Sequence, residues 1–255
     1  MALIQARDVT VDFPVYGTNA RSFKNAMLRA ATGGVLAKSA ADRVIVRALD
    51  QLSFEFHEGD RVGLVGHNGS GKSTLLRVIA GVYEPVSGSI KVEGHIASML
   101  NIWLGMQMDA TGLENIYIRG RLLGMVPRQI DDLIDDICGF AELGDYIQMP
   151  LRTYSSGMQM RLAFAISTSA APDIVLMDEW LSAGDAEFAE KARARLTQML
   201  DRTKILVVAS HNEDMIRKSC NKILKLDHGT LIGLTAIEKN MTIEALDRKI
   251  KTMVA

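Results

Sequence analysis

Three short, mainly apolar segments stand out along the chain, and each is followed by polar residues. They are Arg61–Val65, Ile174–Met177 and Ile205–Ala209. Apolar runs of four or five residues are typical of parallel strands buried on both faces in an α/β sheet. Ligands of such sheets bind at the carboxyl ends of the strands, so we expect chemistry in the residues that follow each segment.

A second set of strand-like segments predicts an antiparallel β layer. These segments are Ala2–Phe13, Ala48–Phe56 and Ser89–Glu93, with Gly59 and Gly88 as turn residues. Glycine and polar residues at the ends of such segments are typical of strands joined by turns.

Between about residue 109 and residue 169 the apolar positions recur with helical spacing. The segments concerned are Gly112–Leu123, Pro127–Phe140 and Met158–Ser169. A recurrence every three to four residues predicts amphipathic helices. We therefore expect a helical subdomain, about 109–169, inserted into a sheet domain.

Two amphipathic segments lie outside this core. Residues 18–31 place apolar side chains on one helical face and three cations, Arg21, Lys24 and Arg29, elsewhere. Such a basic helix is a candidate gate or membrane-surface element, and the alternative is an exposed insertion with one solvated face. The segment Thr242–Met253 repeats the apolar spacing near the C-terminus.

Composition narrows the class of protein. The 255 residues carry 29 Lys and Arg against 30 Asp and Glu, and 48% of them are hydrophobic. These values describe an ordinary globular chain, and a net charge of -1 argues against a nucleic-acid-binding surface over the whole protein. Cys138 and Cys220 form no metal or redox motif. No apolar run approaches the ~18 residues of a membrane span.

The segment Gly66–Ser73 reads GHNGSGKS and fits the pattern G-x-x-x-x-G-K-[ST]. It follows a predicted strand and opens a predicted helix, Thr74–Ala80, which is the context that this phosphate-binding motif requires. Its glycines let backbone N–H groups surround phosphate oxygens. Lys72 reaches the outer phosphates, and the Ser73 hydroxyl is suited to Mg²⁺.

The other two strands end in residues suited to ATP hydrolysis. Asp178 and Glu179 follow the second strand. Since side chains alternate along a strand, we expect Asp178 to face the metal and Glu179 to face an attacking water. His211 follows the third strand, where an imidazole can hydrogen-bond a γ-phosphate.

The segment Tyr154–Met158, which reads YSSGM, begins a predicted helix. A Ser-Gly turn at a helix start suits a second anion site, which makes sense mainly for the nucleotide of a partner chain. The alternative is simple N-capping by Ser155 or Ser156.

Together these motifs resemble those of an ABC-type nucleotide-binding domain, over nearly the whole chain. The resemblance implies an α/β P-loop NTPase fold: a RecA-like core with an antiparallel β layer and an inserted helical subdomain. The ATP-binding domain would span 1–235, with a basic insertion at about 18–46, and a short helical tail would span 236–255.

Three features resemble the ATPase subunits of cell-surface polysaccharide exporters, which serve O-antigen, capsule and teichoic acid. They are the YSSGM signature, the segment Thr111–Ile116 that matches T-G-x-E-N-I, and the basic insertion. An exporter of lipids, drugs or small solutes is the alternative. An ABC ATPase that processes nucleic acid would usually carry long coiled-coil insertions or two tandem ATPase domains, and this chain has neither. A P-loop GTPase would need the guanine-reading motif N-K-x-D, and here Leu224 stands in place of its aspartate.

The resemblance also implies residue roles. Nine residues would bind the phosphates of ATP: Gly66, His67, Asn68, Gly69, Ser70, Gly71, Lys72, Ser73 and Thr74. Ser155, Ser156 and Gly157 would contact the ATP of the opposite protomer, and Asp185 would lie in a dimer-contacting loop. Ser73 would hold Mg²⁺ directly and Asp178 would hold it through water. Glu179 would be the catalytic base and His211 the γ-phosphate sensor.

Two roles have alternatives. The residue that couples nucleotide to the permease is Asn101 or Gln107, with Asn101 at about the expected distance before Thr111. The aromatic residue that stacks on adenine is Phe13 or Tyr16, with Tyr16 matching in type.

The resemblance further implies ATP and Mg²⁺ as cofactors, a homodimer of ATPase subunits and transmembrane permease subunits, without nucleic acid. The chain would lie peripherally at the cytoplasmic face of the cell membrane, held by the permease. About twenty residues follow Thr235, too few for an additional carbohydrate-binding domain. Selection of the cargo would then fall to the membrane partner.

Overall fold

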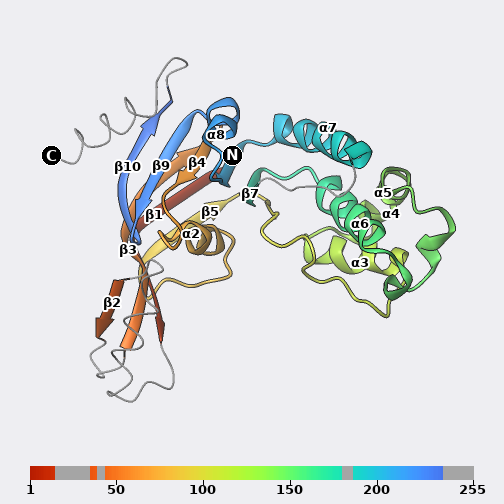
Figure 1. Cartoon of the computed structure of the whole chain (residues 1–255), viewed down its shortest axis with the longest axis horizontal. Coiled ribbons are helices and arrows are strands. Elements are labelled where there is room, and N and C mark those ends of the chain that lie inside the picture. Colours follow the sequence, from red (N-terminus) through yellow and green to blue (C-terminus); the bar gives the residue numbers. More distant parts are fainter. Residues whose placement is uncertain (15–34, 39–43, 180–185, 238–255) are drawn as a thin grey trace. The chain divides into compact units, whose positions relative to one another are not determined.

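The computed structural model describes residues 1–14, 35–38, 44–179 and 186–237 (Figure 1). The chain divides into two compact units. The first comprises residues 1–96, 176–179 and 204–255, and the second comprises 97–175 and 180–203. Most of the basic insertion and nearly all of the C-terminal tail lie outside the described residues.

An antiparallel sheet forms one part of the first unit. Its strands run in the order β2 (Val35–Lys38), β3 (Val44–His57), β1 (Leu3–Pro14) and β5 (Ser87–Glu93). Strand β1 lies at the centre and pairs antiparallel with both β3 and β5. The predicted antiparallel layer is therefore confirmed.

The second sheet contains the apolar strands. Its order is β10 (Thr230–Ala236), β9 (Lys222–Asp227), β4 (Arg61–Val65), β8 (Ile205–Ala209), β7 (Ile174–Asp178) and β6 (Ile96–Ser98). Strand β4 is parallel to both β8 and β9, and β10 returns antiparallel to β9. All five residues of β8 are buried, which explains its unbroken apolar sequence.

Two helices of the first unit support the strand that leads into the phosphate loop. Helix α2 (Lys72–Ile79) follows β4 through that loop, and α8 (Glu213–Ser219) follows β8. Gly63 lies in the middle of β4, where an added Cβ would stand 2.5 Å from Cγ2 of Ile216 on α8. A glycine at this position therefore allows α8 to pack directly on the strand.

The second unit is mainly helical. Its longer helices are α3 (Gly112–Leu122), α5 (Ile134–Ala141), α6 (Ser156–Ser169) and α7 (Ala186–Arg202). Shorter elements are the helix α4 (Pro127–Asp131) and two 3₁₀ turns, η3 (Gly144–Gln148) and η4 (Leu151–Thr153). Among the described residues, no helix is both long and apolar enough to cross a membrane.

The prediction of one continuous helix over Pro127–Phe140 is wrong, because the segment forms α4 and α5 with a break at Asp132 and Leu133. Leu133 donates its N–H to Ile130, three residues back, so the α-helical pattern is interrupted there. An unbroken helix would place Asp131 over Asp135 and Asp132 over Asp136. Like charges four residues apart repel, which favours the break.

Three phenylalanines hold α5, α6 and α7 together. Phe140, Phe164 and Phe188 are buried, and their ring centroids lie 5.5 to 6.1 Å apart. The guanidinium of Arg195 lies 4.5 Å from the Phe140 centroid, and that of Arg161 lies 5.1 Å from the Phe188 centroid. The second unit therefore has its own aromatic core, covered by cations at its edge.

Candidate functional site

The loop between β4 and α2 is shaped by two glycines. Gly66 and Gly71 have φ values of 152° and 106°. An added Cβ at Gly66 would stand 2.3 Å from the carbonyl oxygen of Leu226, and one at Gly71 would stand 2.8 Å from that of Ala48. No side chain fits at either place without moving backbone. The loop can therefore wrap closely only because these residues are glycine.

Lys72 is folded over this loop. Its Nζ donates to the carbonyl oxygens of Gly66, at 2.7 Å, and His67, at 3.0 Å. Burial lowers the pKa of the Lys72 ammonium, and the carboxylates of Asp178 and Glu179 oppose that lowering. The predicted phosphate-loop lysine and the two predicted acidic residues thus belong to one electrostatic environment within the first unit.

Ser70 leaves a polar group without a partner inside the loop. The residue is fully buried, and its Oγ is the one buried side-chain oxygen or nitrogen without a hydrogen bond among the described residues. Buried hydroxyls in folded proteins are nearly always hydrogen-bonded, so this atom calls for an explanation. An oxygen-rich ligand in the loop would supply one, as the phosphate-loop motif predicts.

The two acidic residues lie at the carboxyl end of β7. Asp178 is the last residue of the strand, and Glu179 follows with a left-handed backbone, φ 66°. The Glu179 N–H donates to the carbonyl oxygen of Ala209, the last residue of β8, at 2.8 Å. The sequence predicted that the Asp178 and Glu179 side chains point in different directions because side chains alternate along a strand. Because Glu179 lies beyond the strand, its direction is set by this left-handed turn instead.

His211 follows the carboxyl end of β8, and hydrogen bonds hold the residues on either side of it. The Ser210 hydroxyl accepts from the N–H of Asn212 at 3.0 Å, and the Asn212 side chain caps α8 by accepting from Met215 at 3.0 Å. The imidazole itself is exposed. Strands β4, β7 and β8 therefore present Lys72, the acidic pair and His211 along one edge of the sheet, as the sequence predicted.

In the second unit, Ser155 is the N-cap of α6. Its Oγ accepts from the Met158 N–H at 3.2 Å, which is the capping role considered for this segment. Ser155, Ser156 and Gly157 are all exposed, and an added Cβ at Gly157 would meet nothing closer than 3.9 Å. Capping accounts for Ser155 locally. The surface around Gly157 is open, and contact with a partner's nucleotide stays a prediction.

The T-G-x-E-N-I segment has a clear structural basis. Thr111 caps α3, with its Oγ1 accepting from Glu114 N–H at 3.1 Å and its own N–H donating to the Glu114 carboxylate at 2.7 Å. These reciprocal bonds form a capping box, and the hydrogen bonds that the carboxylate accepts from the Thr111 N–H and hydroxyl lower the pKa of Glu114. Gly112 has no room for a side chain, because a Cβ there would stand 2.3 Å from the hydroxyl of Tyr154.

Two further residues of α3 fix the segment that carries the predicted coupling residues. Asn115 was predicted only as part of the T-G-x-E-N-I segment, and Arg119 was not predicted to have a role. Asn115 is fully buried, and its side chain bonds both the N–H and the carbonyl of Gln107, at 2.7 and 3.0 Å. Arg119, one turn later, donates to the Ile102 carbonyl and, at 2.9 Å, to Ser167 Oγ. Burial lowers the pKa of Arg119 to about 10.

The remaining predicted residues are placed as follows. Asn101 is exposed, and its side chain accepts from the Trp103 N–H at 3.0 Å. Phe13 lies in β1, with its ring edge-on to Tyr83 at a centroid distance of 5.2 Å. Tyr16 and Asp185 lie outside the described residues. The choices between Asn101 and Gln107, and between Phe13 and Tyr16, stay predictions.

Comparison with known proteins points to one family. A family model described as "ABC transporter" matches residues 49–182. The O-antigen export system ATP-binding protein RfbE of Yersinia enterocolitica is 45% identical over 225 residues, which cover 88% of this chain and 94% of RfbE. The chain is also 38% identical to the O-antigen export system ATP-binding protein RfbB of Myxococcus xanthus, covering 47% of it. It is 40% identical to the teichoic acids export ATP-binding protein TagH of Listeria innocua, covering 55% of it.

Solved structures show the same fold. A structure described as the ATP-binding subunit of an ABC transporter has a TM-score of 0.70 at 15% identity, covering 98% of this chain and 99% of that one. The ATP-binding cassette MJ0796, solved as a dimer bound to ADP and Pi, has a TM-score of 0.65 at 20% identity, covering 92% and 99%. With its phosphate loop, its acidic strand end and its close relatives, the chain belongs to the ABC transporter family, as an ATP-binding, ATP-hydrolysing protein.

Proposed function

We propose that this protein is the ATP-hydrolysing subunit of an ABC exporter that moves a cell-surface glycan of the O-antigen kind across the cytoplasmic membrane. The observation that carries the proposal is the 45% identity to RfbE, which extends over 94% of that O-antigen export protein. RfbB and TagH, which are also named for the export of surface glycans, support the same cargo class.

The phosphate loop fits a nucleotide by its own chemistry. It combines close-packed glycines, a buried lysine and the unpartnered hydroxyl of Ser70. The N-cap of α2 is Gly71, which has no side chain to occupy the first N–H groups of the helix. Those N–H groups and the positive end of the helix dipole suit phosphate oxygens. We assign the loop residues, from Gly66 to Thr74, to the phosphates of ATP.

The metal and catalytic roles follow from the same edge of the sheet. Ser73 and Asp178 would hold Mg²⁺, which when bound neutralises charge on the phosphates. Glu179 would orient and deprotonate the attacking water, and its turn, fixed by the bond to Ala209, holds the carboxylate beyond the strand end. His211 would donate a hydrogen bond to the γ-phosphate. Lys72 would exchange its loop carbonyls for phosphate oxygens.

Two copies of the chain would act together. The exposed Ser155, Ser156 and Gly157 would contact the nucleotide bound to the loop of a second copy, and Asp185 would lie at the contact between copies. The dimers of MJ0796 support this arrangement. The names of the export-system relatives support transmembrane permease partners, through which the chain would associate with the membrane.

The proposal is tested in inverted membrane vesicles from cells that express the chain with its permease. ATP should drive a lipid-linked glycan into the lumen, and Glu179→Gln should abolish that transport. Glu84→Gln, which changes an exposed glutamate outside the site, is the matched control and should transport normally. ATP-dependent transport of a lipid or drug without any glycan would favour the alternative cargo.

A further inference from the structure

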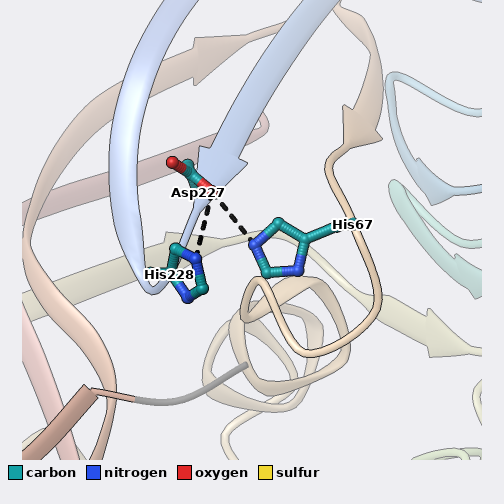
Figure 2. A group of neighbouring side chains, drawn as sticks. All are labelled: His67, Asp227 and His228. Atoms are coloured by element: carbon teal, nitrogen blue, oxygen red, sulfur yellow. Dashed lines mark hydrogen bonds and ion pairs between the residues drawn. The ribbon is translucent and has the colours of Figure 1, made fainter. Parts of the chain in front are cut away.

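Three side chains suited to metal binding meet beside the phosphate loop (Figure 2). His67 comes from the loop itself, Asp227 is the last residue of β9, and His228 begins the turn between β9 and β10. The Nε2 of His67 lies 3.0 Å from Oδ1 of Asp227, and the Nε2 of His228 lies 3.8 Å from the same oxygen. One ligand atom from each residue lies within 4.8 Å of the others.

The backbone holds these residues in place. His228 and Gly229 have φ values of 45° and 81°, as a tight two-residue hairpin turn requires. Gly229 donates its N–H to the carbonyl oxygen of Ser70 at 3.0 Å, and its own carbonyl accepts from Asp50 at 2.8 Å. The turn is therefore fastened to the phosphate loop by the main chain. The three side chains meet because of this backbone contact and do not depend on one another for it.

The orientation of His67 also favours coordination. Its Nδ1 lies 2.7 Å from the carbonyl oxygen of Asn68. A carbonyl oxygen only accepts, so Nδ1 donates in this contact and Nε2 is the nitrogen that faces Asp227. The Asp227 carboxylate also only accepts, so an ion at Nε2 would take the place of the proton that joins these two side chains. Histidines that bind metals typically donate their other ring N–H to a carbonyl or carboxylate in this way, which fixes the ring.

We propose that His67, Asp227 and His228 form a binding site for a divalent transition-metal ion of the zinc class. Imidazole nitrogen and carboxylate oxygen are ordinary Zn²⁺ ligands, and three protein ligands with an open fourth position make a recognised site. Ligand bonds of about 2.0–2.2 Å in a tetrahedron place ligand atoms about 3.3 to 3.6 Å apart. The two histidine distances to Oδ1 of Asp227, 3.0 and 3.8 Å, lie on either side of that range. All three residues are exposed, so small side-chain rotations close the site.

A metal in this site would act on the phosphate loop. The His67 carbonyl accepts from Lys72 Nζ at 3.0 Å. An ion that ties the His67 ring to the β9–β10 turn would hold that carbonyl, and with it the lysine, in the present arrangement. We therefore expect Zn²⁺ to slow ATP hydrolysis by keeping Lys72 on the loop. This consequence depends on the loop being the ATP site, whereas metal binding itself does not depend on the cargo or on the proposed function.

The site is tested by titrating the metal-free, nucleotide-free full chain with Zn²⁺ in a calorimeter. The wild type should bind one ion at this site, and His228→Asn and Asp227→Asn should each weaken binding by about tenfold or more. Asn tolerates a left-handed backbone, so His228→Asn preserves the turn. The matched control is His57→Asn: the His57 side chain is 56% exposed, like that of His228, and Glu55 is its partner at 3.1 Å. This control should bind Zn²⁺ as the wild type does.

Co²⁺ provides a second readout, because a four-coordinate ion absorbs visible light strongly. The wild type and His57→Asn should show this absorption, and His228→Asn should lack it. The site is overturned by the absence of saturable Zn²⁺ binding, or by affinity and absorption that His228→Asn and Asp227→Asn leave unchanged.

The effect on the loop is measured separately, as Zn²⁺ inhibition of ATP hydrolysis in excess Mg²⁺. The zinc–ATP complex forms equally in every reaction, so a difference between variants reports the protein site. Inhibition should be strong in the wild type and at least several-fold weaker in His228→Asn. Equal inhibition of both would overturn the proposed restraint of Lys72.

Discussion

Asn115 holds in place the segment that carries the predicted coupling residues, Asn101 and Gln107, and the structure sets the loss of stability expected when its side chain is removed. Asn115 is fully buried, and its side chain accepts from the Gln107 N–H and donates to the carbonyls of Gln107, Ala110 and Thr111. In Asn115→Ala all four main-chain groups lose this partner at once. A buried group left without a hydrogen bond costs about 1–3 kcal/mol. The carbonyls of Ala110 and Thr111 keep the N–H groups of Leu151 and Asn115 as donors, so the loss is counted as the two bonds to Gln107.

Because Gln107 is exposed and water can partly replace these two bonds, we take about 1–2 kcal/mol for each and expect Asn115→Ala to lower the free energy of unfolding by about 2–4 kcal/mol. For a chain of this size that corresponds to a fall in Tm of about 5–15 °C. Thermal and urea unfolding followed by circular dichroism measure both quantities. The matched control is Asn101→Ala, which removes one exposed side-chain bond to Trp103 and should cost less than about 1 kcal/mol.

Asn115→Asp refines the same test. The carboxylate is isosteric and still accepts from Gln107 N–H, but its second oxygen faces three carbonyl oxygens where the amide donated. It should therefore destabilise at least as much as alanine. A loss below about 0.5 kcal/mol for both Asn115 variants would refute the argument that this side chain fastens the segment.

Glu179→Gln should still bind ATP but hydrolyse it about 10²–10³ times more slowly, measured by phosphate release, and near-normal turnover would remove Glu179 from its role. Lys72→Ala should weaken ATP binding in a fluorescence titration, and unchanged affinity would contradict the loop assignment. Gly63→Ala should cost about 1–3 kcal/mol in urea unfolding through its clash with Cγ2 of Ile216, and Ile216→Leu, which lacks that methyl group, should restore part of it. In native protein at pH 8, iodoacetamide should leave Cys220 unmodified by mass spectrometry, because burial raises the pKa of its thiol to about 12, and rapid labelling would show that it is accessible.

The sequence was sufficient for three strands of the second sheet, β4, β7 and β8, and for the position of the phosphate loop, whereas β6, β9 and β10 were not predicted. The bounds of β4 and β8 match the predicted segments, because strands buried on both faces have uninterrupted apolar sequences. The glycine spacing of Gly66–Ser73 also predicts the loop directly, since the main chain needs glycine at Gly66 and Gly71, where a Cβ would collide with backbone.

Other features were not predicted. The break at Asp132 and Leu133 has a local signal, the carboxylates spaced four residues apart, but this signal competes with an otherwise helical pattern. The left-handed turn of Glu179 depends on a hydrogen bond to β8. Asn115 and Arg119 look like ordinary polar helix residues until the segment they fasten is in place.

The proposed metal site is another feature that the sequence alone could not predict. His67 and Asp227 are separated by 160 residues and meet only because the β9–β10 turn bonds to the phosphate loop. The relevant signal in the sequence, an Asp-His-Gly turn after a strand, acquires meaning only when the pairing of β9 with β4 is known.

The most direct test of the central claim is the glycan profile of the native cell surface when Glu179→Gln replaces the normal copy. Long-chain glycan should disappear from the surface while lipid-linked polymer accumulates inside, and cells carrying Glu84→Gln should keep the normal profile. A normal surface profile in cells whose Glu179→Gln protein is expressed and hydrolytically inactive would contradict the assignment to glycan export.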